Sequence, residues 1–428
     1  MTHPRVVFIS YNGLLEPLGA TQILPYVRAL AEGYRMTILS FEKPGEDRAA
    51  AARLAEALQA QGMTWLRERY HKSPSLPATL YDIARGLRRL AREHAREPVD
   101  LVHARGYVPA AIAWGLRRRL GIPYLFDVRG LQAEESVDAG HWSPRGVKFW
   151  LTKRIEQRLL RDADGLVTLT EAIRPTVLAL PGLAGRGSLP PWEVIPCCAD
   201  LDHFRFRHEA RAGLRAGLGL EERTILVYAG SVGTWYLVDE MAAFYAAARR
   251  TMPGLFFLWL VNGSPRLVRA VLARHGIAEG PDALIRQARF EEMPDYLSVA
   301  DAGIAFIRPC LSKRSSSPTK FAEYLACGLP LVINAGIGDA DRLVEQHGAG
   351  VLVRTFTREA YAEAATALRN QLARGRAAFR EVAETHFSLA QRAVPAYRRL
   401  YEQLLGRPSG VAQDGVDEAA AAHAVHAT

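Results

Sequence analysis

A lysine and a carboxylate stand three residues apart in the stretch SSSPTKFAEYLACGLPLVIN, which covers residues 315–334. Ser317 can cap a helix and Pro318 suits its first turn, because no helical hydrogen bond needs the missing N–H there. Lys320 and Glu323 then share one face near the positive end of that helix. A phosphate binds readily at such an end, and a carboxylate one turn further can accept hydrogen bonds from a ribose diol. The same spacing fits a surface salt bridge between Lys320 and Glu323 equally well.

The residues around this pair predict the elements that position it. Phe321, Tyr324 and Leu325 recur at helical spacing and would form the buried side of the helix. Gly328 ends that helix, because glycine readily adopts the left-handed conformation that follows a helical C-terminus. Residues 329–333 read as a buried strand with a proline near its start. The pair is therefore expected on a helix that leads into a buried strand.

Segments of strand length alternate with segments of helical periodicity along most of the chain. This alternation predicts an α/β fold with parallel sheets that are covered by helices on both faces. A first array of strands is expected at residues 6–10, 35–41, 63–69, 100–105, 123–129, 165–170 and 192–197. A second array is expected at residues 224–230, 256–261, 283–289, 302–307 and 329–333. In such sheets ligands bind at the C-terminal ends of the strands.

Charged residues cluster at two of these strand ends. Asp127 and Arg129 would point the same way, because side chains alternate along a strand, and unpaired burial of two charges would be costly. An internal ion pair that braces the loop is the alternative to a binding role. Glu134 and Glu135 could bind hydroxyl groups or remain solvated. His103 ends another strand, where a histidine is more often a satisfied core residue than a catalyst.

Glycines mark two further strand ends. Gly19 closes the loop after the first strand, before a helix expected to begin near residue 20, and glycine lets the backbone approach a neighbour closely. Gly230 and Gly233 flank Ser231 after the first strand of the second array, where backbone N–H groups could line an anion cradle. The first loop does not have the GxGxxG spacing, so it gives little support to a dinucleotide site.

The chain resembles the family-4 (GT4) glycosyltransferases in five segments that follow the family order: GLLEPLGATQILPYVRALA, YLFDVRG, VIPCCADLDHF, YAGSVGTWY and SPTKFAEYLACGLPLVI. These are retaining enzymes of the GT-B fold that take sugars from nucleotide-sugar donors. The resemblance implies two Rossmann-like domains that face a central cleft. It places an acceptor domain at residues 1–198, completed by a crossing helix at 387–405, and a donor domain at 199–386. The alanine-, glycine- and acid-rich tail at 406–428 is expected to be disordered.

The resemblance also implies roles for individual residues. Glu323 carries over as the ribose ligand and Lys320 as a phosphate ligand. The nucleobase is expected against the loop that begins at Arg289. Asp127, Arg129 and Lys320 are the expected catalytic residues. The remaining donor-binding candidates are Gly19, Gly230, Ser231, Gly233, Arg308, Lys313 and Ser315, and the acceptor-binding candidates are His103, Glu134 and Glu135.

The chain departs from the family pattern in three places. Many members carry an arginine and a lysine in the loop that reads SVGTW here, so the charge must come from elsewhere. The candidates are Arg308, Lys313, Arg314 and Lys320, each of which could instead lie in solvent. Ser315 stands where members often have the first of two glutamates, and members often have a histidine near the place of Arg129.

Composition limits the partners and the compartment. The net charge of +9 implies an anionic partner, but no nucleic-acid recognition motif or set of stacking aromatics accompanies it. Arginine-rich helices in the first half could lie on anionic lipid headgroups or be solvated faces. No apolar run approaches the ~20 residues of a membrane span, so we expect a cytoplasmic protein, peripheral at most on the inner face of the membrane. Four cysteines without CxxC spacing, and no DxD-like carboxylate pair, indicate no metal.

We therefore expect a retaining transfer of sugar from a UDP- or GDP-sugar to a glycan, glycolipid or other hydroxyl acceptor, in bacterial polysaccharide or glycoconjugate synthesis. One alternative is a nucleotide-sugar epimerase, which needs acid–base groups and has only Asp127, Glu134 and Glu135 as candidates. The other is a non-catalytic sugar- or lipid-binding scaffold. Ser315 and the missing loop cations favour the scaffold, whereas Lys320 and Glu323 oppose it.

Overall fold

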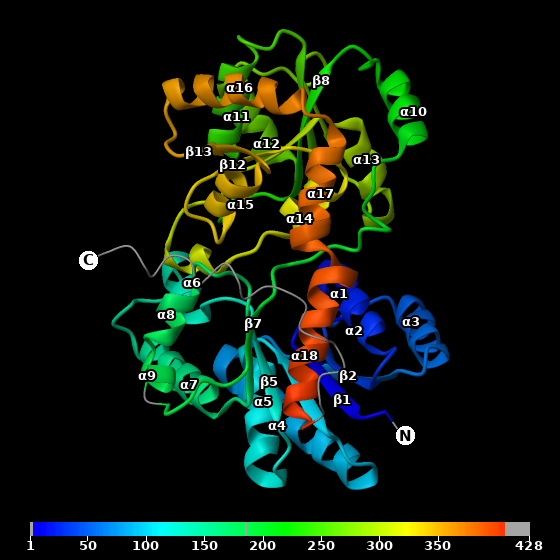
Figure 1. Cartoon of the computed structure of the whole chain (residues 1–428), viewed down its shortest axis with the longest axis vertical. Coiled ribbons are helices and arrows are strands. Elements are labelled where there is room, and N and C mark those ends of the chain that lie inside the picture. Colours follow the sequence, from blue (N-terminus) through cyan, green and yellow to red (C-terminus); the bar gives the residue numbers. More distant parts are fainter. Residues whose placement is uncertain (1–2, 185, 407–428) are drawn as a thin grey trace, which may run out of the picture.

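The computed structural model describes residues 3–184 and 186–406, which form two α/β lobes, one above the other in Figure 1. The lower lobe contains a seven-stranded sheet of order β3-β2-β1-β4-β5-β6-β7, and the upper lobe a six-stranded sheet of order β10-β9-β8-β11-β12-β13. Neighbouring strands in both sheets pair in parallel. The prediction of an α/β protein with two Rossmann-like sheets is confirmed.

The lower lobe is built from the first half of the chain. Its strands are β1 (Arg5–Ser10), β2 (Arg35–Glu42), β3 (Thr64–Arg69), β4 (Leu101–Arg105), β5 (Tyr124–Val128), β6 (Gly165–Thr168) and β7 (Trp192–Val194). Its helices are α1 (Pro17–Gln22), α2 (Leu24–Leu30), α3 (Arg48–Ala60), α4 (Ser75–Arg96), α5 (Tyr107–Leu120), α6 (Gln132–Asp138), α7 (Val147–Asp162), α8 (Arg174–Leu178) and α9 (Pro181–Ala184).

The upper lobe follows the same plan. Its strands are β8 (Thr224–Ser231), β9 (Leu255–Asn262), β10 (Ala283–Arg286), β11 (Ala302–Ala305), β12 (Leu331–Asn334) and β13 (Gly350–Val353). Its helices are α10 (His208–Leu218), α11 (Val238–Ala248), α12 (Arg266–Arg274), α13 (Met293–Val299), α14 (Thr319–Ala326), α15 (Ala340–His347), α16 (Arg358–Leu372) and α17 (Arg376–Phe387), with short 3-10 turns η1 (Phe290–Glu292) and η2 (Leu311–Ser315). The short strand β13 was not predicted.

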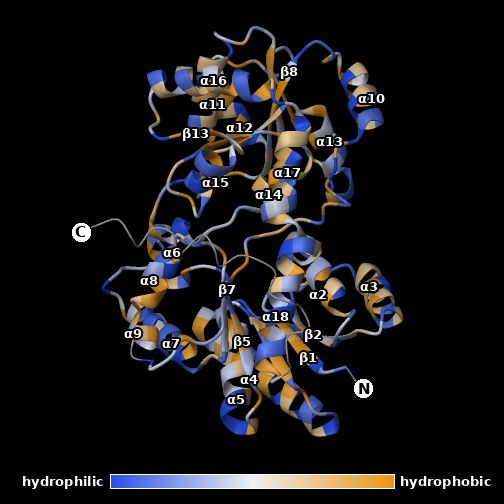
Figure 2. Ribbon diagram, in the orientation of Figure 1, coloured by the Kyte–Doolittle hydropathy of each residue, from blue (hydrophilic) through white to orange (hydrophobic). Residues whose placement is uncertain are grey.

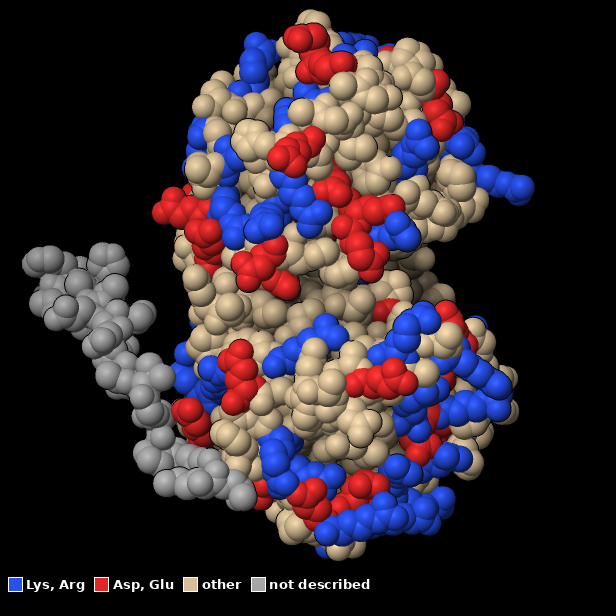
Figure 3. Space-filling view, turned by 90° about the vertical axis from the view of Figure 1, so that its right-hand side faces the viewer, with Lys and Arg blue, Asp and Glu red and all other residues tan. Residues whose placement is uncertain are grey.

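Both sheets are buried on two faces, which explains their nearly continuous apolar strands. Val6 and Phe8 on β1 pack on one side of the lower sheet, whereas Val7 and Ile9 pack on the other. Figure 2 shows hydrophobic residues along the strands and hydrophilic residues on the outer helices. In the side view of Figure 3 both lobes carry mixed charges, and the waist between them is largely uncharged.

The last helices connect the lobes. α17 packs on α14 in the upper lobe, and the chain then continues through one π-helical turn, η3 (Leu389–Ala393), into α18 (Val394–Leu404). Leu389, Val394, Tyr397 and Tyr401 are buried in the same core as β1 and α2, so α18 completes the lower lobe (Figure 1). The predicted crossing helix is confirmed. The expected tail lies mostly outside the described residues.

No helix in residues 3–184 and 186–406 is both long and apolar enough to cross a membrane.

Candidate functional site

The C-terminal ends of the two sheets face each other across the waist, and α14 lies there in the upper lobe. Phe321, Tyr324 and Leu325 are buried, and Gly328 has a φ of +73° just after the helix, both as predicted. The predicted cap is wrong. Helix α14 begins at Thr319, and Ser317 instead accepts a hydrogen bond from the N–H of Cys197 in the lower lobe, at 3.0 Å.

Lys320 is buried among aromatic rings rather than against a carboxylate. Its side chain is 5% exposed, and its Nζ lies 3.7 Å from the ring centre of Tyr236 and 5.3 Å from that of Tyr228. A Cβ on Gly230 would lie 3.2 Å from Nζ, so the glycine leaves room for the ammonium group. No residue in the described part of the chain forms an ion pair or hydrogen bond with this Nζ. Its ammonium group is therefore in contact with no carboxylate among the described residues.

Glu323 lies one turn further along α14 and is also left without a partner. Burial raises the pKa of its carboxyl to about 7, and the charge of Lys320 lowers it only in part. Among the described residues, Lys320 and Glu323 do not form the salt bridge that the sequence allowed, and neither of their charged groups pairs with another side chain. A buried site that leaves two opposite charges unpaired is a candidate ligand site.

Two of the other predicted phosphate ligands are already paired. Arg308 and Lys313 lie over the indole of Trp235, at 4.9 and 3.8 Å from its centre. Arg308 also donates to the carbonyl oxygen of Asp138, and Lys313 pairs with Glu135 at 2.6 Å. Both acceptors belong to α6 of the lower lobe, so these cations connect the lobes.

Arg314 and Ser315 are likewise engaged. Arg314 donates to the carbonyl oxygen of Ala172 at 3.3 Å, and the hydroxyl of Ser315 donates to the carbonyl oxygen of Ser312 at 2.6 Å. Ser315 is 4% exposed, and its Oγ would lie 3.6 Å from a Cβ on Gly130 of the lower lobe. It therefore helps to close the waist.

The glycine-bearing loops differ from each other. Gly230 and Gly233 have φ values of +140° and +98°, as the predicted turn requires, and Ser231 between them is exposed. Gly19 lies inside α1 instead of ending a loop. A Cβ there would lie 2.3 Å from the carbonyl oxygen of Leu14, so this glycine permits contact with its own loop. The close contact that requires a glycine at position 19 is therefore with the protein's own loop, whereas contact with a ligand stays a prediction.

Arg289, expected beside a nucleobase, has a largely exposed side chain. It pairs with Glu292 at 2.9 Å at the start of η1. The guanidinium therefore stabilises this turn, and the place of a nucleobase beside it stays a prediction.

Asp127 and His103 belong to the core. This agrees with the interpretation of Asp127 as part of an internal ion pair and of His103 as a core residue. Both are 1% exposed, and the imidazole Nε2 lies 3.6 Å from Asp127. The Tyr401 hydroxyl lies 2.6 Å from His103 Nδ1, and the Tyr397 hydroxyl donates to Asp127 at 3.3 Å. Arg129 also pairs with Asp127, at 3.5 Å. Since both tyrosines lie on α18, this network anchors the crossing helix.

The two glutamates after β5 both form ion pairs, and the side chain of Glu135 is also 46% exposed. Lys153 of α7 lies 2.8 Å from Glu134, and Glu135 holds Lys313. The epimerase alternative needs Asp127, Glu134 and Glu135 as free acid–base groups, and the structure leaves none of the three unpaired.

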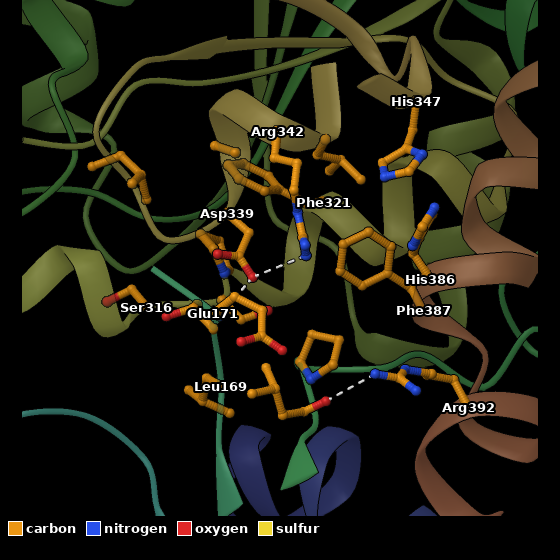
Figure 4. Close-up of a pocket in the computed structure, with 18 residues that line it drawn as sticks. Leu169, Glu171, Ser316, Phe321, Asp339, Arg342, His347, His386, Phe387 and Arg392 are labelled. Atoms are coloured by element: carbon orange, nitrogen blue, oxygen red, sulfur yellow. Dashed lines mark hydrogen bonds and ion pairs between the residues drawn. The ribbon is translucent and has the colours of Figure 1, made fainter. Parts of the chain in front are cut away.

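Two hollows lie near the residues described above. One lies at the ends of β4 and β5 and is lined by Arg105, Arg129, Gly130 and the first turn of α5. The other lies beside the start of α14 (Figure 4). In the second hollow Asp339 accepts hydrogen bonds from the N–H groups of Glu171 and Ala172, both at 2.9 Å, so it too connects the lobes.

Sequence reasoning missed Arg105, Asp138 and the roles of Trp235 and Tyr236. Arg105 ends β4 only two residues after His103, so its position at a strand end was the available signal. The aromatic contacts of Trp235 and Tyr236 had no such signal, because they depend on how segments far apart in the sequence pack within the upper lobe. Within residues 3–184 and 186–406 no cluster of His, Cys, Asp or Glu could hold a metal ion.

Comparisons with known proteins agree with this architecture. Residues 19–192 match the family model described as glycosyl transferase 4-like domain. The D-inositol 3-phosphate glycosyltransferase of Segniliparus rotundus is 25% identical over 295 residues, which are 67% of this chain and 62% of that protein. The match therefore spans less than two thirds of the relative.

Solved structures share the fold at low sequence identity. Sucrose-phosphate synthase from Thermosynechococcus elongatus is 17% identical with a TM-score of 0.71, covering 94% of this chain and 100% of its own. HepE from Anabaena, solved in complex with UDP-glucose, is 16% identical with a TM-score of 0.65 and the same coverage. Residues 19–192 are therefore similar to glycosyl transferase 4-like domains, and the chain as a whole has the GT-B fold of these solved structures.

Proposed function

We propose that this chain is a glycosyltransferase that moves a sugar from a nucleotide-sugar donor to a hydroxyl acceptor. One observation carries the proposal: Lys320 is buried beside Gly230 at the waist of a GT-B fold, Glu323 lies partly buried one turn further along α14, and neither is paired with another described residue. A diphosphate would supply the charge that Lys320 lacks, and a ribose diol would donate hydrogen bonds to Glu323. The complex of HepE with UDP-glucose supports a UDP-sugar as the first donor to test.

The transfer we propose retains the anomeric configuration and needs no protein nucleophile. The bond between the anomeric carbon and the diphosphate oxygen breaks, and the acceptor oxygen forms its bond on the same face. The acceptor proton passes to an oxygen of the leaving diphosphate. Lys320 and the backbone at Gly230–Gly233 would stabilise that developing charge. Because Asp127 is buried, we assign it to positioning Arg129 rather than to contact with the substrate.

The acceptor side would lie at the ends of β4 and β5, where Arg129 and Gly130 line a hollow that faces Ser315. A glycan or glycolipid hydroxyl in bacterial polysaccharide or glycoconjugate synthesis is the acceptor class we propose. No metal is part of the proposal, since Lys320 supplies the positive charge at the diphosphate.

We also propose that the protein lies peripherally on anionic membranes through α7. Val147, Trp150, Leu151 and Ile155 are 78%, 57%, 37% and 44% exposed on this helix. The cations exposed on the same outer face are Lys148, Arg154, Arg158 and Arg161. The carboxylate of Glu156 on this helix is buried, and Lys153 pairs with it from the inner side. Arg161 pairs with Asp162 at 3.0 Å, and exposed apolar side chains beside the other three cations suit an anionic lipid surface.

The membrane proposal is tested by co-sedimentation with vesicles of phosphatidylcholine, with and without phosphatidylglycerol. Trp150→Asp should reduce binding to anionic vesicles at least tenfold, because it removes apolar area and adds a negative charge. Leu267→Asp is the matched control, since Leu267 is 47% exposed on α12 of the other lobe. Equal binding by both variants would contradict the assignment to α7.

The donor site is tested by thermal shift with UDP, GDP, ADP and their common sugars. We expect one nucleotide series to stabilise the wild type and Glu323→Ala to reduce that shift. Glu363→Ala, an exposed glutamate on α16, should leave it unchanged. If no nucleotide stabilises the protein, the donor site is wrong. Donor turnover with and without an acceptor then distinguishes a transferase from an epimerase or a non-catalytic scaffold.

A further inference from the structure

We propose that the hollow at the ends of β4 and β5 binds a phosphate group through Arg105, Arg129 and the first turn of α5. This inference deepens the proposed function and rests on it for the identity of the molecule that carries the phosphate. Two sources fit the chemistry equally: the diphosphate of the donor, or a phosphate on the acceptor.

The charge balance of the hollow is the main observation. Arg129 is 3.5 Å from Asp127 and 3.1 Å from the Sγ of Cys197. Arg105 also lines the hollow, but no other described residue gives it an ion pair or a hydrogen bond. Asp127, the nearby buried carboxylate, already contacts Arg129, His103 and Tyr397 and forms no ion pair with Arg105. One positive charge remains without a partner.

The acid that lines this hollow, Glu135, does not correct the imbalance. Its carboxylate is 2.6 Å from Lys313 of the upper lobe. Burial together with the like charge of Arg129 lowers the pKa of Arg105 to about 10, in spite of the opposing charge of Asp127. A bound anion would remove this destabilisation of the cation.

The start of α5 adds hydrogen-bond donors to the same hollow. This helix has 14 residues, and no side chain caps its N-terminus at Gly106, whose φ is +89°. Tyr107 and Val108, in its first turn, line the hollow beside Arg105. Uncapped first-turn N–H groups favour an anion. Two guanidinium groups next to them favour a phosphate, which they can bind in a bidentate manner.

The experiment titrates the full chain with inorganic phosphate, followed by calorimetry, and separately with UDP and with uridine. The variants are Arg105→Gln, Arg105→Lys and, as a control at the other end of α5, Arg119→Gln, which is exposed. Thermal melts check that each variant is folded. Removing a charge-assisted contact should weaken the affected binding about 10- to 100-fold. Arg105→Lys should retain part of it, because the charge remains and the planar fork is lost.

The two sources give different results. If the site holds the donor diphosphate, Arg105→Gln weakens UDP but leaves uridine unchanged. If it holds an acceptor phosphate, UDP binding is unchanged and inorganic phosphate binding at saturating UDP is lost in the variant. The proposal is overturned if the wild type and Arg105→Gln bind both probes alike, or if the wild type binds neither. Phosphate binding that depends on Arg105 without any nucleotide binding would refute the proposed function and leave this site standing.

Discussion

Replacing Glu323 by glutamine should stabilise the protein at alkaline pH. Burial raises the pKa of this carboxyl from 4.5 to about 7, so the folded protein holds the proton more tightly than the unfolded chain. Stability therefore falls as the pH rises between these two values, and the full penalty applies above about pH 7. The difference in pKa corresponds to about 3 kcal/mol, which is an upper value because Glu323 is only partly buried.

Glutamine has the same shape and no charge, so Glu323→Gln should escape this penalty. We expect the free energy of unfolding to rise by up to about 3 kcal/mol near pH 8.5 and by less than about 1 kcal/mol near pH 5, where the wild-type carboxyl is largely protonated when folded. Urea unfolding at both pH values measures this, with Glu363→Gln as the control on exposed α16. A loss of stability near pH 8.5, or a gain independent of pH, would show that the carboxylate has a partner.

Three further predictions follow from the same contacts. Lys320→Met should lower donor turnover about 100- to 1,000-fold without lowering the melting temperature, because the ammonium stabilises a leaving group and has no ionic partner to lose. Asp127→Asn should lower the free energy of unfolding by about 2 kcal/mol in urea at neutral pH. Burial raises the pKa of Asp127, but Arg129 and His103 hold it at about 2, below its value in the unfolded chain. The wild type should therefore lose this stability as the pH falls from about 4 to about 2, whereas the variant has no such stability to lose. Asp138→Ala removes the acceptor of the Ser312 N–H at 3.0 Å, so small-angle scattering should show a larger radius of gyration at unchanged secondary structure. An unchanged radius would mean that this hydrogen bond is not needed to hold the lobes together, since Arg308 and Lys313 keep their contacts with α6.

The sheets could be predicted from the sequence because local patterns determine them. Buried parallel strands are short apolar runs, and β1, β4 and β5 were each placed to within two residues. Strand ends were less certain: the predicted strand at residues 283–289 stops at Arg286, before the exposed Arg289. Gly328 was predictable for the same reason, since a left-handed residue after a helix is a local requirement.

The pairing of charges could not be predicted, because it depends on contacts between distant segments. Lys313 meets Glu135 across 178 residues of sequence, and Asp127 meets Tyr397 across 270. Nothing near Lys313 indicates that it faces α6 rather than a ligand. The sequence therefore indicated a cluster of cations that includes Lys313 and Lys320, but it could not distinguish those that join the lobes from Lys320, and it missed Arg105.

That distinction bears on the missing loop cations. In this chain Trp235 and Tyr236 occupy the loop where family members often carry an arginine and a lysine, and their rings hold the ammonium groups of Lys313 and Lys320 at 3.8 and 3.7 Å. An aromatic face attracts a cation but cannot neutralise it. Lys320 is thus held in place while its charge stays available, whereas Lys313 is neutralised by Glu135. We infer that the cationic role passes from the loop to Lys320 on α14; Arg105, at the end of β4, likewise has no ionic partner among the described residues. A negatively charged group between the lobes would lie near both Lys320 and Arg105. The nucleotide experiment tests the side of the waist that carries Lys320, and the phosphate experiment tests the side that carries Arg105.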